Sequence, residues 1–157
     1  MGTDRPHMHK KIKILAIASI GGHWIQLLRL KPLFERNETV YVSTNHSFGE
    51  MVDGKFYSVS DFNRNNLRGA LNTIIDLFRI YKKEKPRVVI TTGAAPGLVG
   101  LMIAKSMGIR TVWIDSVANV EELSLSGRIA SKFCSRVYTQ WPDLAKGRIV
   151  YAGNILS

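Results

Sequence analysis

Two adjacent glycines and a histidine, Gly21-Gly22-His23, are the residues of this chain whose types and spacing best suit chemistry. They lie between an apolar run, Ile12 to Ala18, and a helix-like stretch, His23 to Arg36. A strand, two glycines and a helix leave unpaired backbone N–H groups at the helix start, where they and the helix dipole can hold a phosphate or diphosphate. We therefore expect a phosphorylated ligand.

His23 falls in the first turn of that helix, where an imidazole can meet the same ligand as hydrogen-bond donor, proton acceptor or cation. The alternative is that Gly21 and Gly22 only form a tight strand-to-helix turn and that His23 is a polar cap. The full dinucleotide fingerprint G-x-G-x-x-G is missing, so this motif leaves both interpretations open.

Length and composition indicate a single domain. The chain has 157 residues, 45% of them hydrophobic, which is enough to bury one core. Residues 1–7 look like an expression-tag remnant ahead of a natural start at Met8, so we expect one domain over residues 8–157. The single cysteine, Cys134, excludes an intramolecular disulfide and is expected to be a small core hydrophobe.

The charge balance favours anionic partners. With 22 Lys and Arg against 12 Asp and Glu, the net charge of +10 suits phosphates, an acidic membrane surface or nucleic acid. No apolar run approaches the roughly 20 residues that cross a bilayer, and no signal-peptide pattern is present. We expect a cytoplasmic chain with peripheral contact to the inner face of the cell membrane.

The elements that must position Gly21, Gly22 and His23 alternate between strand and helix. Apolar and β-branched runs predict strands at residues 11–19, 39–43, 55–59, 88–92, 111–115, 136–140 and 149–151. Helical periodicity predicts helices at residues 23–36, bent or divided at Pro32, and at 67–85, 98–107 and 126–134. Residues 44–54 are expected to be loop, and 93–97 a turn of small residues.

This alternation predicts an α/β fold with a Rossmann-like parallel sheet and helices on both faces. In such folds ligands bind beyond the carboxyl ends of the strands. Four polar or glycine-rich clusters follow strands here and are expected to converge on one edge: Gly21-Gly22-His23, Thr92-Gly93-Ala94, Asp115-Ser116 and Gln140-Trp141.

Four ordered blocks carry a family resemblance: SIGGHWIQLLRLKPLF, TTGAAPGLVG, WIDSVANVEELSLSGRIA and TQWPDLA. Over roughly Lys11 to Leu156 the chain resembles the bacterial PssD-type capsule and exopolysaccharide glycosyltransferase subunits. These are similar to the membrane-recruiting subunit of the two-subunit eukaryotic UDP-GlcNAc transferase that extends dolichyl-diphosphate GlcNAc.

The resemblance implies the N-terminal half of a GT-B glycosyltransferase of MurG type, whose N-terminal domain binds the lipid-diphosphate acceptor. The chain ends about where that domain should end. We therefore expect a second polypeptide to supply the site for the UDP-sugar donor, and little or no activity without it. The expected acceptor is a polyprenyl-diphosphate saccharide in capsule or exopolysaccharide synthesis, with neither a cofactor nor a metal.

The matching blocks also imply site residues. Acceptor or diphosphate contacts would come from the following set: Gly21, Gly22, Thr92, Gly93, Pro96, Ser116, Asn119, Ser124, Ser126, Gly127 and Arg128. In an inverting transfer His23 is the first candidate for the base that accepts the acceptor's proton, and Asp115 the second. Gln140, Trp141 and Pro142 are expected at a subunit interface or in packing.

Several of these residues have a structural alternative. Asp115 could cap neighbouring backbone N–H groups, and we favour that slightly. Ser124 or Ser126 could only cap the following helix, and Arg128 could be a solvated charge. Apolar residues of helices 67–85 and 98–107 could rest on anionic lipid, but for most of them covering the sheet is the favoured interpretation. Lys82, Lys83, Lys85 and Arg87 are the expected lipid contacts.

Three other classes of function stay open. A Rossmann-type nucleotide-binding enzyme would explain the fold, but a ribose-binding acid is missing after the second strand, where Ser43-Thr44-Asn45 stands. A nucleic-acid-binding module would explain the charge, but no RNA- or DNA-binding signature is present, so we do not expect nucleic acid as a partner. The chain could also be a non-catalytic scaffold that recruits and activates a catalytic partner.

Overall fold

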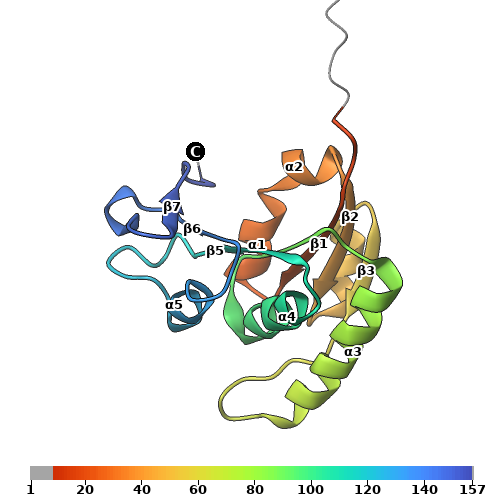
Figure 1. Ribbon diagram of the computed structural model, residues 1–157. Helices are drawn as coiled ribbons and strands as arrows, with labels where there is room; N and C mark the ends of the chain where they lie inside the picture. Colours follow the sequence, from red (N-terminus) through yellow and green to blue (C-terminus); the bar gives the residue numbers. More distant parts are fainter. Residues whose placement is uncertain (1–8, 157) are drawn as a thin grey trace, which may run out of the picture.

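The computed structural model describes residues 9–156, so the predicted tag remnant lies outside the described residues. Its centre is a seven-stranded sheet in which every neighbouring pair is parallel, in the order β3-β2-β1-β4-β5-β6-β7 (Figure 1). The strands are β1 (Lys13–Ala18), β2 (Glu38–Ser43), β3 (Lys55–Ser58), β4 (Val88–Thr91), β5 (Arg110–Ile114), β6 (Arg136–Thr139) and β7 (Ile149–Tyr151). All seven strands that the sequence predicts are present.

Helices cover both faces of the sheet, as predicted. They are α1 (Gly22–Leu28), α2 (Lys31–Glu35), α3 (Arg68–Glu84), α4 (Ala94–Ser106) and α5 (Leu125–Ala130), with 3₁₀ helices η1 (His46–Met51) and η2 (Pro142–Leu144). One core lies between the sheet and α3, α4 and α5. A second lies between the sheet and α1 and α2, which sit together on the other side in Figure 1. The Rossmann-like α/β architecture is therefore confirmed.

The helix predicted at residues 23–36 is divided near Pro32, as expected: the chain turns between Leu28 and Lys31, and Pro32 is the second residue of α2, in a first turn where no N–H is required. Two other elements differ locally from the sequence prediction. Helix α4 begins at Ala94, so Pro96 and Gly97 belong to its first turn and not to a longer loop. The loop predicted at residues 44–54 contains η1, which Asn45 caps by accepting a hydrogen bond from the N–H of Ser47.

Helix α3 faces the sheet with a different set of residues from the one that its apolar stripe predicts. Its buried residues are Thr73, Leu77, Ile80, Tyr81 and Glu84. Several apolar residues of the predicted stripe point outward instead: Leu67, Leu71, Ile75 and Phe78 are exposed. The expectation that most of the stripe covers the sheet is therefore wrong. Apolar residues occupy a wider arc of α3 than the sheet can cover, and the remainder forms an exposed surface.

The order of the strands fixes where a ligand can bind. Strand β1 pairs with β2 on one side and with β4 on the other, so successive connections leave β1 in opposite directions. Loops diverge at such a switch point and leave a crevice outside the carboxyl ends of the strands. The β1–α1 and β4–α4 loops border that crevice, and these loops contain Gly21 and Gly93.

Candidate functional site

A pocket of about 180 Å³ opens at this switch point. It brings together eight residues that the sequence analysis singled out: His23, Thr92, Gly93, Asp115, Ser116, Asn119, Ser124 and Ser126. They come from the loops that follow β1, β4 and β5, so three of the four predicted clusters meet in this pocket, whereas Gln140-Trp141 after β6 does not line it. We call this cavity the switch-point pocket.

Two reciprocal hydrogen bonds join His23 to Thr92 across the switch point. The Nδ1 atom of His23 lies 3.0 Å from the carbonyl oxygen of Thr92, and the hydroxyl of Thr92 donates to the carbonyl of His23 at 2.5 Å. A carbonyl oxygen can only accept, so Nδ1 must carry a proton. In the neutral ring Nε2 is then the unprotonated nitrogen, which is the state that a general base needs.

Gly93 makes this arrangement possible. Its backbone has φ +136°, a region that favours glycine, and a Cβ atom there would lie 2.5 Å from Nδ1 of His23. Directly after it, the 13-residue helix α4 begins, and Ala94 of its first turn lines the pocket. The N–H groups of Ala94 and Ala95 lack helical partners, and Ala94 lines the same pocket as His23, so this helix start can hold negative charge although Pro96 adds no N–H.

Asp115 is the centre of a hydrogen-bond network at the end of β5. Its carboxylate accepts from the indole N–H of Trp113 at 2.9 Å and from the side-chain amide of Asn119 at 2.9 Å. Ser124 adds two further donors, its hydroxyl at 2.7 Å and its backbone N–H at 3.1 Å. Because Asp115 is only 2% exposed and meets four donors, the geometry favours the capping alternative over a general base.

The same network shapes the start of α5. Ser124 is the N-cap of this helix and accepts from the N–H of Gly127 at 2.9 Å, so its predicted capping alternative is confirmed. A Cβ atom at Gly127 would lie 2.5 Å from the carboxylate of Asp115, which explains the glycine. Ser126 follows the cap and lines the pocket with its first-turn neighbour Leu125.

Hydrogen bonds also join the loop after β5 to α1 and to the segment that follows β6. The side chain of Gln26 is 8% exposed; it donates to the hydroxyl of Ser116 at 3.0 Å and accepts from the N–H of Val117 at 3.3 Å. From the other side, the indole of Trp141 donates to the carbonyl of Val117 at 2.9 Å. Gln26 was missed at the sequence level, because a glutamine among apolar helical positions gives no signal of its partners.

The remaining predicted residues lie outside the pocket. Gly21 and Gly22 adjoin His23 and are exposed, with open space where a Cβ would stand. Pro96 and Gly127 are buried in helices α4 and α5. Arg128 is exposed and lies 3.7 Å from Glu122, which favours the solvated-charge alternative.

The residues Gln140, Trp141 and Pro142 make contacts within the chain, whereas their predicted alternative role at a subunit interface stays a prediction. The side-chain oxygen of Gln140 accepts from the N–H of Ile155 at 2.9 Å, and its carbonyl accepts from Asn154. Pro142 begins η2. These contacts hold the end of the described chain against β6.

Arg64 is a pocket residue that the sequence analysis missed. It stands in the loop between β3 and α3 and lines the switch-point pocket. Its stretch, Asn63 to Asn66, has no periodicity and follows no strand end that was singled out, so only the fold brings it to the site. A guanidinium at this place can neutralise an anionic ligand held by the start of α4.

Neither a metal cluster nor a membrane-spanning helix is found in residues 9–156. No three His, Cys, Asp or Glu side chains gather closely enough to hold a metal ion. None of the helices in this range is both long and apolar enough to cross a bilayer.

Comparisons with known proteins identify the family and the fold. The family described as "Oligosaccharide biosynthesis protein Alg14 like" matches residues 57–155. The UDP-N-acetylglucosamine transferase subunit ALG14 of Yarrowia lipolytica is 34% identical over 74 residues, which are 43% of this chain and 34% of that protein. The subunit of the same name from Mus musculus is 22% identical, over 99% of this chain and 88% of that protein.

A solved structure shows the same fold. The crystal structure of MurG from Acinetobacter baumannii matches with a TM-score of 0.74 and 16% identity, over 90% of this chain and 45% of that chain. The chain spans about a third of the length of the fungal relatives that it matches. With most of its length matched by one family, the chain belongs to the Alg14-like oligosaccharide biosynthesis family, with the N-terminal Rossmann-like fold of GT-B glycosyltransferases.

Proposed function

We propose that the chain is the acceptor-binding and membrane-recruiting subunit of a two-component UDP-sugar glycosyltransferase that acts on a polyprenyl-diphosphate saccharide. One observation carries the proposal: His23, with Nδ1 committed to Thr92, stands beside the first turn of α4 in the switch-point pocket. An imidazole suited to act as a base and a helix start suited to hold an anion at one opening support the proposal. Family membership supports the reaction class, since relatives are named as UDP-N-acetylglucosamine transferase subunits.

In this proposal the acceptor hydroxyl approaches Nε2 of His23, which takes its proton as the oxygen attacks the anomeric carbon of the sugar. The new carbon–oxygen bond forms as the bond to UDP breaks, and UDP leaves with the electron pair. The first turn of α4 and Arg64 hold the acceptor's diphosphate charge. Asp115 is a positioning residue, because it fixes the loop that carries Ser116 and Asn119.

The donor site belongs to a partner subunit in this proposal. Relatives of the chain are named as subunits of a UDP-N-acetylglucosamine transferase, which supports a partner subunit. Synthesis of capsule or exopolysaccharide, as in PssD-type subunits, is the setting that we propose. UDP-GlcNAc is the first donor to test, because the curated relatives are named for it.

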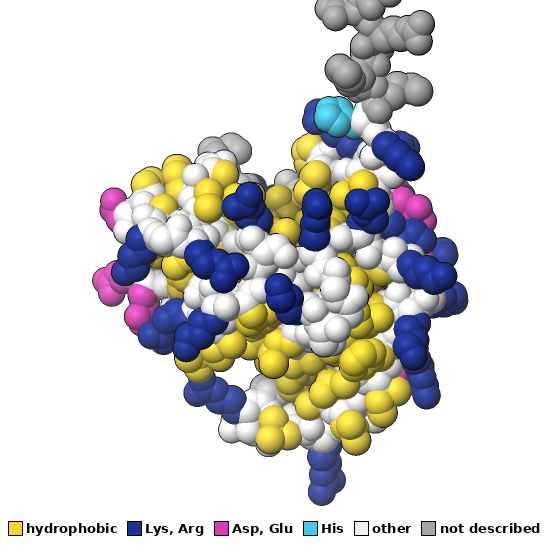
Figure 2. Space-filling view, in the orientation of Figure 1, with side chains coloured by type: hydrophobic (Ala, Val, Ile, Leu, Met, Phe, Trp, Pro, Cys, Tyr) yellow, Lys and Arg dark blue, Asp and Glu magenta, His cyan; other side chains and the backbone are white. Residues whose placement is uncertain are grey.

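The surface of α3 and α4 supports a membrane-facing role at the inner face of the cell membrane. Its exposed apolar residues are Leu67, Leu71, Ile75 and Phe78 on α3 and Met102 on α4. A shallow apolar hollow between the helices is lined by Ile74, Phe78, Val99 and Met102, among others. Figure 2 shows hydrophobic side chains gathered over α3 and α4 with Lys and Arg around them, a pattern that suits anionic lipid.

The test is a transfer assay from a panel of UDP-sugars to a polyprenyl-diphosphate saccharide. The chain is assayed alone, with the protein encoded beside it, and as His23→Ala with that partner. We expect activity only with the partner and a loss of about 100- to 10,000-fold in the variant, the range of general-base catalysis. The matched control is His46→Ala, because His46 is exposed on η1 and does not line the pocket.

Other results would change the assignment. Equal activity without the partner would contradict the two-component proposal. Full activity of His23→Ala with the partner would leave a recruiting scaffold as the function of this chain.

A further inference from the structure

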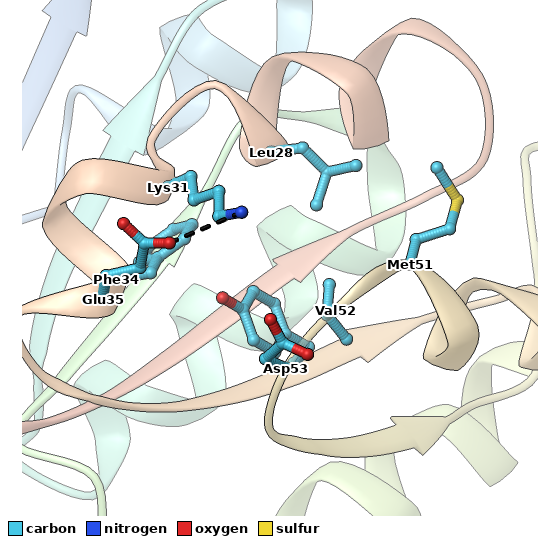
Figure 3. A pocket seen from close by; sticks show the side chains of 8 residues that line it. Leu28, Lys31, Phe34, Glu35, Met51, Val52 and Asp53 are labelled. Atoms are coloured by element: carbon cyan, nitrogen blue, oxygen red, sulfur yellow. Dashed lines mark ion pairs between the residues drawn. The ribbon is translucent and has the colours of Figure 1, made fainter.

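A second pocket lies between α1, α2, β2 and the end of η1, away from the switch point. Its volume is about 170 Å³, and it shares no residue with the switch-point pocket. Helices α1 and α2 contribute Leu28 and Phe34, and the end of η1 contributes Met51 and Val52 (Figure 3). We call it the α2–η1 pocket. These four side chains give it an apolar lining.

Tyr41 of β2 brings a polar group into this lining. The residue is 6% exposed, and its hydroxyl makes no hydrogen bond to any other residue in the range 9–156. Its ring is held edge-on by two neighbours, Phe34 at 5.6 Å and Trp24 at 6.4 Å between centroids. The ring is buried and fixed, whereas the hydroxyl has no protein partner and stays accessible from the pocket, so a ligand there can bond to it in place of water.

Two carboxylates stand at the same pocket. Glu35 is paired with Lys31 at 3.4 Å across one turn of α2, drawn as a dashed line in Figure 3, whereas Asp53 has no ion pair within the described residues. Burial, and then the charges of Asp53 and Glu35, raise the pKa of Tyr41. The phenol therefore stays neutral at physiological pH, and its oxygen can accept a hydrogen bond.

The charge of the pocket argues against the ligands proposed for the other site. Its two carboxylates, Glu35 and Asp53, outnumber its one cationic side chain, Lys31. Phosphates would meet Glu35 and Asp53, and like charges repel. What fits is a slim apolar stem that ends in hydrogen-bond donors with positive charge.

We propose that the α2–η1 pocket binds one alkyl cation, the guanidinium or ammonium group of an arginine or lysine side chain that a protein partner inserts. The stem packs on Leu28, Phe34 and Val52, and the head group donates to Asp53, to Tyr41 and to Glu35. Charge complementarity is local, because this acidic opening belongs to a chain with a net charge of +10. Buried basic side chains in such pockets are common anchors of protein interfaces.

The first experiment uses n-butylguanidinium as a probe and follows the amide signals of Val52 and Asp53 by NMR titration. Asp53→Asn and Tyr41→Phe remove one acceptor each and keep the shape of the pocket. We expect each to weaken binding about threefold, and Asp53→Asn combined with Glu35→Gln to weaken it about tenfold. Lys31→Met removes a competing cation and should strengthen binding about threefold. Asp143→Asn, an exposed acid on η2, is the matched control.

Pentanoate and n-butanol have similar stems without positive charge. Binding of either as tight as that of n-butylguanidinium would overturn the proposal, and so would unchanged binding in the Asp53→Asn, Glu35→Gln double variant. Unaltered amide spectra outside the pocket show that each variant is folded.

The source of the cation is decided by a second titration. A short peptide, Leu-Arg-Leu with blocked ends, is compared with Leu-Gln-Leu and with n-butylguanidinium. Binding of the arginine peptide at least tenfold tighter than that of either reference supports a protein partner. Equal binding of peptide and free guanidinium would overturn the protein partner and assign the pocket to a free amine. Neither result depends on transferase activity, so failure here and failure of the proposed function are separable.

Discussion

His23 can act as a base only while its ring keeps the orientation that Thr92 gives it. The contact with the Thr92 carbonyl leaves Nε2 as the free nitrogen of the neutral ring. Gly93 allows this contact, because it has no side chain next to the imidazole and its backbone has a conformation that other residues rarely adopt. The chemistry of the site therefore depends on a residue that has no functional group.

Gly93→Ala tests this dependence. A Cβ atom 2.5 Å from Nδ1 must displace the ring, and the positive φ adds strain. We expect transferase activity with the partner to fall at least about 100-fold, and the free energy of unfolding to fall by about 1–3 kcal/mol. Gly108→Ala is the matched control: its φ is +73°, and a Cβ there meets nothing within 4 Å. Gly108→Ala should lower the free energy of unfolding by about 1 kcal/mol and leave transferase activity unchanged. Equal losses of activity in both variants would contradict the steric argument.

Site residues differ in how far the sequence reveals them. His23 comes shortly after one predicted strand and Asp115 ends another, so the rule that strand ends carry ligands identifies both. Arg64 and Gln26 follow no such rule, because the first comes from a loop without periodicity and the second from the middle of a short helix. Only the three-dimensional arrangement brings Arg64 to the pocket and Gln26 to the loop that carries Ser116.

Among the elements, the loop between β5 and α5 is the one that hydrogen bonds organise most strongly. It carries Ser116, Asn119 and Ser124 to the switch-point pocket, and Asp115 holds it with both carboxylate oxygens. A loop fixed in this manner has little freedom to lose when a ligand binds, which favours affinity.

Asp115→Asn should therefore loosen this loop. The amide has one accepting atom where the carboxylate has two, so at least one of the donors from Trp113, Asn119 and Ser124 loses its partner. We expect the free energy of unfolding to fall by about 1–3 kcal/mol, measured by urea denaturation. Hydrogen exchange at the amides of Ser124 and Gly127 should become faster. If Asp115 were only a general base, exchange at these amides would stay unchanged. Asp143→Asn, on exposed η2, serves as the control.

A buried carboxylate joins three other elements. Glu84 at the end of α3 is 2% exposed and meets the Tyr57 hydroxyl of β3 at 2.5 Å, Lys55 at 3.3 Å and Lys13 of β1 at 3.4 Å. Burial alone would raise the pKa of Glu84, but the Tyr57, Lys55 and Lys13 contacts outweigh it, so the pKa is lowered. This cluster fixes the end of α3 against the sheet.

The stability of the fold should depend on this carboxylate in acid. Because folding lowers the pKa of Glu84, its stabilising effect is complete above the unfolded value, near 4.5, and is lost as the pH falls through the lower folded value. We expect Glu84→Gln to lose about 1–3 kcal/mol at pH 7 in urea denaturation, and less of a difference from the original chain at pH 3. Glu35→Gln breaks an exposed pair and should cost at most about 0.5 kcal/mol. A constant difference from pH 7 to pH 3 would contradict the linkage.

Element types were predictable because strands such as Val88-Val89-Ile90 are unbroken apolar runs and α3 has strong helical periodicity. The face that helix α3 turns toward the sheet was less predictable. The apolar positions of α3 span more than one face, and only packing decides that Leu77 and Ile80 meet the sheet while Leu71 and Phe78 do not. The division of residues 23–36 into α1 and α2, by contrast, was predictable from Pro32.

On the scale of the whole molecule, charge is distributed around the sheet. The edge opposite the switch-point pocket carries Arg87, Arg110 and Arg136, which line a hollow of about 670 Å³. Figure 2 shows Lys and Arg side chains spread over the visible face with few acidic ones. Together with the apolar surface of α3 and α4, this makes attraction to an anionic bilayer the expected long-range interaction.

Vesicle sedimentation checks that expectation with a matched pair of variants. Met102 on α4 is 51% exposed and Met51 on η1 is 50% exposed, so they differ in place and not in exposure. On vesicles of phosphatidylglycerol and phosphatidylcholine, Met102→Gln should weaken binding up to about tenfold, and Met51→Gln should not. Raising the salt from 0.1 to 0.5 M should also weaken binding, because the charges are screened. Equal effects of both substitutions would place the membrane contact elsewhere.

The paired hydrogen bonds between His23 and Thr92 also have a consequence for folding. They join residues 69 positions apart, and they form only after β1 and β4 have come together. Such distant pairings carry a large loop-closure cost and form slowly. In a chain in which β1 has paired only with β2, part of the sheet has formed, but the imidazole of His23 has no Thr92 beside it to fix its orientation. Recovery of transferase activity after dilution from urea should therefore lag behind recovery of helical circular dichroism, and the delay measures the assembly of the sheet's centre.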